Sequence, residues 1–323
     1  MRAILVTDHH ALTLGNAPRP ALGTRDLRIV VRATAVNRAD LLQRVGRYPP
    51  PAGASEILGL ECAGVVAEVG ADVRGWSIGD RAMALLPGGG YAEEVAVDAG
   101  SAMHVPDALS DEEAAALPEV FLTAFLNVFL LARLREGETV LIHGGGSGVG
   151  TAATTLAKLA GARVIVTAGS PEKCERCLAH GADVAINYRE EDFVEKARGA
   201  NVILDHIGAR YLPRDLEALV TDGRIVIIGS MGGERTAELD VMKLLGKRAQ
   251  ILGSTLRSRS AVEKAAIVDA FLTRFGADLE AGRIRPVIHT VLPLEQADDA
   301  HDLMEASEHF GKIVLGVRAF SPH

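Results

Sequence analysis

The stretch Thr139-Val-Leu-Ile-His-Gly-Gly-Gly-Ser-Gly-Val-Gly150 decides the fold, because an apolar run breaks into glycines and then resumes as an alanine-rich helical segment. We interpret it as strand, phosphate-binding turn and helix. Glycines let backbone N–H groups approach a pyrophosphate at the positive end of a helix dipole. The strict Gly-x-Gly-x-x-Gly fingerprint fails, since the aligned positions are Gly145, Ser147 and Gly150. A turn of purely structural purpose therefore stays open as an alternative.

After Pro118 the sequence alternates between strand-like and helical segments, which predicts a parallel sheet covered by helices. The expected strands are residues 139–143, 163–167, 184–187, 201–205, 224–229 and 250–254. Helical spacing of apolar residues marks 150–160, 171–181, 191–197 and 211–220. Six strands in this order predict a doubly wound α/β sheet, with ligand at the carboxyl ends of the strands.

The residues before Pro118 predict a mostly β domain, with short runs at 3–7, 27–36, 64–69, 81–85 and 91–97 separated by glycine and proline turns. The tail leaves the alternation, with a long amphipathic helix at 261–280, strands at 287–291 and 312–317, and a helix at 294–307. We assign the tail to the first domain. The predicted domains are residues 1–117 together with 260–323, and residues 118–259.

Composition excludes several classes of function. The net charge is −8 and aromatic residues are only 4%, so a nucleic-acid partner is not expected. Three widely placed cysteines form no disulfide framework, and the start of the chain lacks a secretory signal, so we expect a cytoplasmic protein. The most apolar segment, 120–132, is shorter than the roughly twenty residues of a membrane span and is expected to be a core helix.

The corner after the second strand of the α/β half predicts the cofactor. Enzymes that use NAD usually end this strand with a carboxylate that binds the ribose 2′-OH. Here Ala168 and Gly169 are followed by Ser170 and, one helical turn on, Lys173. An ammonium attracts a 2′-phosphate that a carboxylate would repel, which predicts NADPH. Alternatively, Ser170 only caps the helix that opens at Pro171, and both roles can coexist.

Neither the cysteines nor the histidines of this half indicate chemistry. Cys174 and Cys177 form a C-x-x-C inside a helical segment without a second Cys or His pair at zinc spacing, so we interpret them as ordinary helix residues. His143, at the end of the first strand, is not expected to act as an acid or a base.

Several motifs in the right order resemble one family. They are AVNRADLLQRVGRYPPP (35–51), ILGLECAGVVAEVG (57–70), GDRAMALLPGGGYAEE (79–94), HGGGSGVGTAA (143–153), NYREEDF (187–193), LRSR (256–259) and HFGKIVL (309–315). Over the whole chain the sequence resembles the zinc-free quinone oxidoreductases of the medium-chain dehydrogenase/reductase superfamily, in the branch of zeta-crystallin and the p53-inducible quinone oxidoreductase.

The resemblance implies a discontinuous GroES-like substrate domain, a Rossmann domain that binds NADPH, and a homodimer joined through the Rossmann edge strands near Gln250 to Ser254. In this family the Ser-Gly-Val-Gly turn replaces the strict fingerprint. The residues implied to face the pyrophosphate and the adenosine 2′-phosphate are Ser147, Gly148 and Val149, and Gly169, Ser170, Lys173 and Tyr188. Those implied to lie near the nicotinamide and substrate are Asn37, Tyr48, Thr123, Leu256 and Arg257.

The expected mechanism follows from what the sequence lacks. Zinc-dependent relatives carry a Cys near position 37 and a Gly-His-Glu motif, whereas this chain has Asn37 and Gly59-Leu60-Glu61, so no metal is expected and Glu61 is expected to be structural. Without a Lewis acid or an evident acid–base pair, the acceptor must already be activated, as quinones and conjugated enones are. Tyr48 and Asn37 are the candidate catalytic residues. Tyr48 could equally be a loop aromatic packed on prolines.

Two other functions stay open. One is a reductase of enoyl thioesters or enones, since the superfamily shares the cofactor half. The other is a non-catalytic NADPH-binding protein, structural or RNA-associated, which the acidic charge and few aromatics make less favourable.

Overall fold

The computed structural model describes residues 1–317, and residues 318–323 of the predicted final segment lie outside the described part. The chain divides into two compact units. Unit 1 comprises residues 1–122 together with the segment that starts at Arg257, and unit 2 comprises Thr123–Leu256. The boundaries predicted from the sequence are Leu117 and Arg259, within a few residues of these.

Unit 2 is a six-stranded, all-parallel sheet in the order β10-β9-β8-β11-β12-β13. Its strands are β8 (Thr139–Ile142), β9 (Arg163–Ala168), β10 (Val184–Asn187), β11 (Ala200–Asp205), β12 (Leu219–Ile227) and β13 (Gln250–Gly253). Its helices are η2, a π-helix (Leu126–Leu131), α4 (Gly148–Leu159), α5 (Pro171–Ala179), α6 (Phe193–Lys196), α7 (Leu212–Ala218) and α8 (Val241–Lys247).

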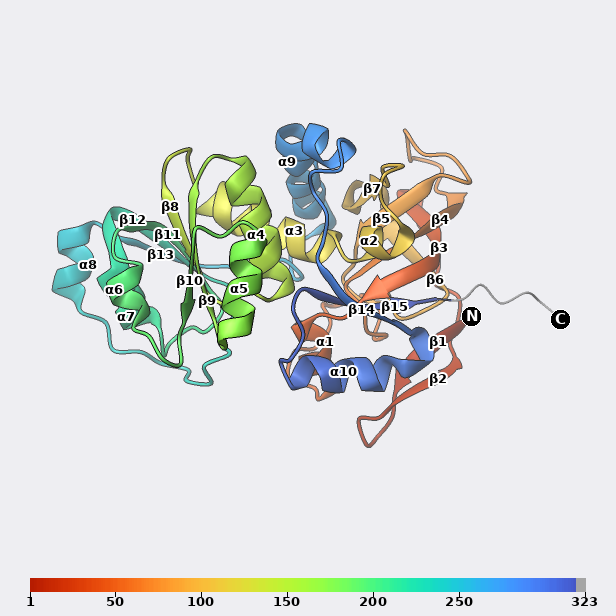
Figure 1. Ribbon diagram of the computed structural model, residues 1–323. Helices are drawn as coiled ribbons and strands as arrows, with labels where there is room; N and C mark the ends of the chain where they lie inside the picture. The colour runs from red at the N-terminus through yellow and green to blue at the C-terminus, as the bar shows by residue number, and fades with distance from the viewer. Residues whose placement is uncertain (318–323) are drawn as a thin grey trace. The chain divides into compact units, whose positions relative to one another are not determined.

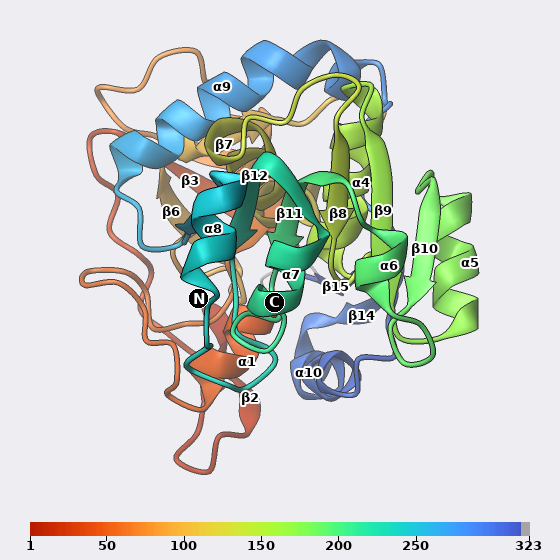
Figure 2. The ribbon, with the colours of Figure 1, turned by 90° about the vertical axis from the view of Figure 1, so that its left-hand side faces the viewer.

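Figure 1 shows α4 and α5 on one face of this sheet and α6 to α8 on the other, and Figure 2 shows the strands side by side. The strand order reverses at β8, which is the topology of a doubly wound sheet. The predicted α/β fold is thus confirmed. Helix α8 was not predicted, and its residues are exposed or only partly buried, which explains why apolar spacing gave no signal there.

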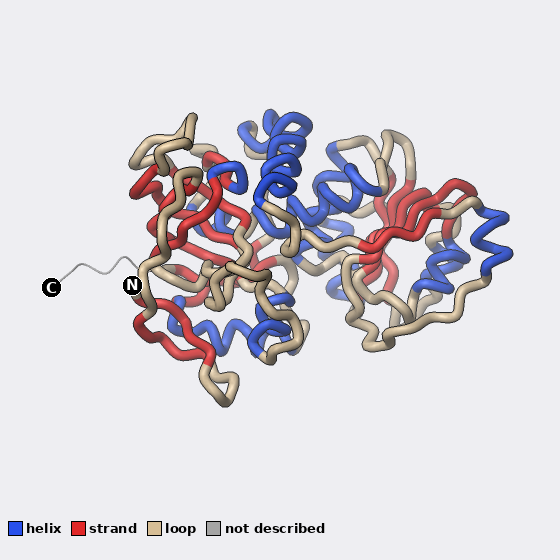
Figure 3. The backbone as a smooth tube through the Cα atoms, turned by 180° about the vertical axis from the view of Figure 1, so that it is seen from behind, coloured by secondary structure: helices blue, strands red, loops and turns tan. Residues whose placement is uncertain are grey.

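Unit 1 is built on a seven-stranded sheet in the order β14-β15-β3-β4-β5-β7 with β6 paired to β3. Figure 3 draws the strands of both units in red. Its strands are β3 (Asp26–Ala35), β4 (Glu61–Val69), β5 (Arg81–Leu85), β6 (Glu94–Asp98), β7 (Ala102–His104), β14 (Ile288–Pro293) and β15 (Lys312–Gly316), with β1 (Arg2–Val6) and β2 (Leu12–Asn16) in a separate pair. Its helices are α1 (Arg38–Arg44), η1 (Ala99–Ser101), α2 (Asp111–Ala115), α3 (Pro118–Phe125, which runs across the unit boundary), α9 (Ala261–Glu280), η3 (Leu294–Gln296) and α10 (Ala297–Glu305).

The tail returns to the first sheet, as predicted: β15 pairs antiparallel with β3 and parallel with β14. This pairing sets the last strand beside the end of β3, where the candidate residue Asn37 follows. Strands β2 and β7 were not predicted, because each is short and β2 alternates little in burial. No helix among residues 1–317 is long and apolar enough to cross a membrane.

Candidate active site

The glycine turn joins β8 to α4, and close packing leaves no room for a side chain at several of its glycines. Gly144 has φ +65°, and a Cβ there would lie 2.2 Å from the His206 ring. A Cβ on Gly150 would lie 2.3 Å from the carbonyl oxygen of Gly144. Ser147 is the N-cap of α4: its Oγ accepts from the Gly150 N–H at 3.0 Å and donates to the Gly144 carbonyl at 2.8 Å. Ser147 therefore caps helix α4 at the position where the strict fingerprint has glycine.

The predicted pyrophosphate residues lie together at the start of α4. Ser147 caps the helix, and Gly148 and Val149 are its first residues. The first N–H groups of a helix have no partner within the helix, and its N-terminal end is positive. This twelve-residue helix can hold an anion there.

A buried histidine, His143, connects the turn to neighbouring elements. His143 Nε2 lies 2.8 Å from Asp215 Oδ1 on α7, and its Nδ1 lies 3.2 Å from Thr167 Oγ1 on β9. The same threonine hydroxyl accepts from the Gly144 N–H at 3.2 Å. The His143 and Asp215 side chains are fully buried, so they fix the turn to β9 and α7.

The predicted 2′-phosphate corner lies at the end of β9. Ser170 is the N-cap of α5, accepting from the Lys173 N–H at 3.2 Å, so the capping role is present. Tyr188 covers Gly169 so closely that a Cβ there would lie 2.8 Å from the phenol oxygen. Burial lowers the pKa of Lys173, and the charges of Arg176 and Arg189 lower it further. Two arginines that the sequence did not single out therefore face this corner, with Glu172 as a weaker opposing charge.

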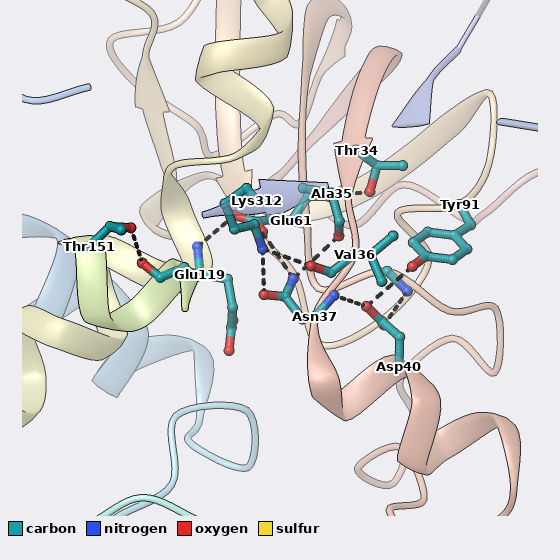
Figure 4. A network of polar contacts seen from close by, with 12 residues as sticks. Thr34, Ala35, Val36, Asn37, Asp40, Glu61, Tyr91, Glu119, Thr151 and Lys312 are labelled. Carbon is teal, nitrogen blue, oxygen red and sulfur yellow. Dashed lines mark hydrogen bonds and ion pairs between the residues drawn. The ribbon is translucent and has the colours of Figure 1, made fainter. Parts of the chain in front are cut away.

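In unit 1, Lys312 is the centre of a buried ionic cluster at the end of β3 (Figure 4). Its ammonium donates to Glu61 Oε1 at 2.8 Å, Asn37 Oδ1 at 2.7 Å and the Val36 carbonyl at 2.9 Å. These three acceptors use all three ammonium protons. Glu61 begins β4 and Lys312 begins β15, so the sheet itself brings this pair together.

Hydrogen bonds from and to neighbouring groups fix the Asn37 side chain within this cluster. Its Nδ2 donates to Glu61 Oε1 at 2.9 Å and to the Ala35 carbonyl at 3.3 Å. Its backbone N–H donates to Asp40 Oδ2 at 2.8 Å, in the first turn of α1.

Asp40 is a second buried carboxylate beside the cluster. It accepts from the Asn37 and Gly59 N–H groups at 2.8 and 3.0 Å, and from the Tyr91 hydroxyl at 3.4 Å. Burial raises the pKa of Asp40 to about 6, against the lowering effect of the two N–H bonds. The Tyr91 hydroxyl also lies 3.1 Å from His301 Nε2, and burial lowers the pKa of His301 to about 3.

A third carboxyl group, Glu119, was missed by the sequence reasoning. It is the second residue of α3, and its N–H donates to Glu61 Oε2 at 2.8 Å. Its own Oε2 is buried without a hydrogen-bond partner in the part of the chain that the structure describes. Burial raises the pKa of Glu119 to about 8, and the charge of Glu61 adds to the increase. The available signal was a single acidic residue heading the apolar run Pro-Glu-Val-Phe-Leu-Thr-Ala-Phe.

Tyr48 and Arg257 lie together in unit 1. The Arg257 guanidinium carbon lies 5.3 Å from the centre of the Tyr48 ring, and the guanidinium donates to the Gln43 side chain at 2.5 Å and the Pro87 carbonyl at 2.8 Å. Burial raises the pKa of Tyr48, and the charge of Glu119 raises it further. Tyr48 therefore lies against the Arg257 guanidinium as well as within its proline-rich loop. The other two implied residues, Thr123 and Leu256, belong to unit 2.

Two family models match the chain. The alcohol dehydrogenase GroES-like domain matches residues 23–107, and the zinc-binding dehydrogenase domain matches residues 148–270. A quinone oxidoreductase of Rattus norvegicus is 31% identical over 304 residues, covering 92% of this chain and 90% of the rat protein.

Two solved structures are similar over nearly the whole chain. An NAD-dependent alcohol dehydrogenase has a TM-score of 0.84 at 33% identity, covering 98% of this chain and 100% of that one. The CurK enoyl reductase has a TM-score of 0.84 at 27% identity, covering 98% and 99%. The chain belongs to the medium-chain dehydrogenase/reductase superfamily and is an oxidoreductase.

A zinc ion, which one matching family description names, does not fit the residues at the end of β3. Zinc prefers thiolate and imidazole ligands, and the groups here are the amide of Asn37 and the carboxylate of Glu61. Both are already held by the Lys312 ammonium. In residues 1–317 no group of three or more His, Cys, Asp or Glu side chains is placed to hold a metal. Cys174 and Cys177 are free thiols buried in α5, and burial raises the pKa of Cys177 to about 12.

Proposed function

We propose that this oxidoreductase is an NADPH-dependent reductase of quinones and similarly activated conjugated carbonyls that works without a metal. Bound NADPH supplies the hydride. The observation that carries the proposal is the Lys312 ammonium, which neutralises Glu61 where a metal-dependent enzyme would need free ligands. With no Lewis acid, an acceptor must delocalise the arriving charge itself, and quinones and enones do so. The similarity to the rat quinone oxidoreductase supports this acceptor class.

Preference for NADPH is supported by the corner at the end of β9. The strand ends at Ala168 instead of at a carboxylate, and Lys173, Arg176 and Arg189 add three positive charges around Ser170. A 2′-phosphate attracts these cations, whereas the 2′-OH of NADH gains little from them.

In the reaction, we assign the chain a positioning role. The anion site at the start of α4 holds the pyrophosphate, and the corner at Ser170 and Lys173 holds the adenosine end. Tyr48, stacked on Arg257, orients the acceptor by hydrogen bonding or ring contact. Asn37 shapes the site through its fixed side chain, since its donors are engaged by Glu61 and Ala35. Orientation of two bound partners alone can contribute several kcal/mol.

The test is an acceptor panel run with NADPH and NADH in parallel. We expect steady NADPH oxidation only in the presence of 1,2- or 1,4-quinones or enones, with a lower kcat/KM for NADH. Absence of turnover with every acceptor would favour a non-catalytic NADPH-binding protein. If Tyr48→Phe leaves kcat and KM for quinone unchanged, the hydrogen-bond donor role of Tyr48 is wrong.

A second candidate activity is reduction of enoyl thioesters, favoured by the similarity to the CurK enoyl reductase. Reduction of this class leaves an enolate that needs a proton, and the protonated Glu119 carboxyl is suited to supply one. A higher kcat/KM for an enoyl thioester than for any quinone would favour it.

We also propose a homodimer joined along β13. Among residues 1–317, this strand is the edge of the unit 2 sheet and pairs with β12 alone. The adjacent helix α8 exposes Val241, Met242 and Leu245 at 58%, 76% and 62%. Exposed apolar side chains of this kind mark a protein interface.

A further inference from the structure

Three carboxyl groups of unit 1, on Asp40, Glu61 and Glu119, gather at the end of β3, and the hydrogen bonds that the structure describes for the nearby lysines go to other acceptors than Glu119. Lys312 donates its three protons to Glu61, Asn37 and Val36, as described above. Lys264 donates to the Arg257 carbonyl at 2.9 Å. No hydrogen bond from either lysine goes to Glu119 among those that the structure describes.

Glu61 and Asp40 have hydrogen-bond donors that compensate a negative charge. Glu61 accepts from Lys312 and Asn37 on one oxygen and from the Glu119 N–H on the other, so its charge is compensated. Asp40 accepts from two backbone N–H groups and the Tyr91 hydroxyl, which stabilise its charged form.

Glu119 has the opposite surroundings. Its buried Oε2 has no partner in the described chain, and it stands next to the negative charge of Glu61. Six charged or titratable groups face it: Glu61 and Asp40 disfavour its ionisation, Lys312 and Lys264 favour it, and Tyr48 and Arg257 are themselves affected by its charge. Burial and the charge of Glu61 outweigh the opposing charges of the two lysines, so the pKa of Glu119 rises to about 8. Its carboxyl group therefore keeps its proton at pH 7.

We propose that Glu119 is the proton donor for the reduced acceptor. This inference rests on the proposed function. When the acceptor has taken the hydride and its electron pair from the reduced nicotinamide, the pair moves through the conjugated system and leaves an enolate or phenolate. The O–H bond of Glu119 then breaks, and its proton forms the new O–H or C–H bond of the product. The resulting Glu119 carboxylate takes a proton from water before the next turnover.

The effect depends on the acceptor. A phenolate from a quinone is a weak base and can be protonated by water after release, whereas the enolate from an enone is much more basic. Loss of the donor should therefore slow enone reduction far more than quinone reduction. A purely structural role of Glu119 would slow both alike.

The experiment compares wild type, Glu119→Gln and the control Glu308→Gln, an exposed carboxylate of unit 1. Glutamine has nearly the size of a protonated glutamate but cannot donate a titrating proton. We expect enone kcat to fall by at least about a hundredfold in E119Q, the low end of the usual contribution of a general acid. In wild type and E308Q, enone kcat should decline above about pH 8, following the Glu119 pKa. This decline should be absent from E119Q, while its NADPH Kd stays within about twofold.

Infrared spectroscopy detects the proton on the Glu119 carboxyl group without any turnover. Wild type and E308Q should show, at pH 7, the C=O stretch of a buried protonated carboxyl that E119Q lacks. If that band is absent, or if E119Q keeps the wild-type rate and pH profile with enones, the inference is wrong while the reductase activity stands. If wild type reduces no acceptor, the proposed function fails and this inference fails with it. Should E119Q not fold, Glu119→Asp must lower enone kcat and keep the pH dependence.

Discussion

At the residue scale, Lys312 and Glu61 form a buried ion pair, and each depends on the other. Removing one member of such a pair leaves an uncompensated charge, which usually costs about 3–5 kcal/mol. The two residues are distant in sequence, and both are almost completely buried.

We predict that Lys312→Met destabilises unit 1 by about 3–5 kcal/mol and that adding Glu61→Gln recovers much of this loss. Urea unfolding can be followed through Trp76, the only tryptophan, which lies in unit 1 and so reports on that unit alone. A cost below about 1 kcal/mol, typical of exposed pairs, would mean that Lys312 is not the essential counter-charge.

The cofactor corner gives a second residue-scale prediction. Lys173→Ala and Arg189→Ala should each weaken NADPH binding by at least about tenfold and leave NADH nearly unchanged, because a hydrogen bond to a charged group contributes about 1.5–3 kcal/mol. Isothermal titration with both cofactors measures this. Lys196→Ala, which removes an exposed lysine paired with Glu191, is the control. Equal losses for NADPH and NADH would contradict the 2′-phosphate role.

At the scale of elements, the turn between β8 and α4 shows how far sequence reasoning reached. The apolar run, the glycines and the helix predicted strand, turn and helix correctly. The failed fingerprint at Ser147 is explained locally, since its hydroxyl caps the helix and bonds back to Gly144. A sequence pattern counts glycines at fixed spacing, whereas the fold needs backbone room at Gly144, Gly145 and Gly150 and a helix cap at Ser147.

We predict that Gly150→Ala destroys NADPH binding, because its Cβ would lie 2.3 Å from the Gly144 carbonyl oxygen and displace the turn. Gly246→Ala is the matched control: it also lies in a helix, α8, and its Cβ would meet nothing within 4 Å. It should leave binding intact and stabilise unit 2 by about 0.5–1 kcal/mol. Intact cofactor binding in G150A would show that the turn tolerates the shift.

The ionic cluster could not be predicted in the same way. The sequence predicts a structural role for Glu61, and this residue is bonded to Lys312 and Asn37. Lys312 is part of the family motif HFGKIVL, but nothing in the sequence assigns it a partner. The acidity of Glu119 depends on burial and on Glu61, 58 positions away in sequence. Local patterns carry strand and helix periods, whereas a pKa is set by neighbours that only the assembled sheet brings together.

At the scale of the whole molecule, the proposed homodimer places its contact at β13 and α8 of unit 2. We predict that Met242→Glu together with Leu245→Glu converts a dimer into a monomer, because a charge placed in an apolar contact must be desolvated. Light scattering after size-exclusion chromatography measures the mass. Ile78→Glu, at a residue of unit 1 that is 72% exposed, is the control and should not change it. A wild-type monomer would contradict the edge-strand dimer.

The late position of Lys312 also has a consequence for biosynthesis. Unit 2 is encoded entirely by residues 123–256, so the ribosome delivers all of its strands in one uninterrupted stretch. Unit 1 starts earlier, but the cation that neutralises Glu61 is made some 250 residues after that carboxylate. Glu61 therefore lacks its lysine partner until the strand that begins at Lys312 emerges, and a translation product that stops before residue 312 contains all of unit 2 and an unfinished unit 1.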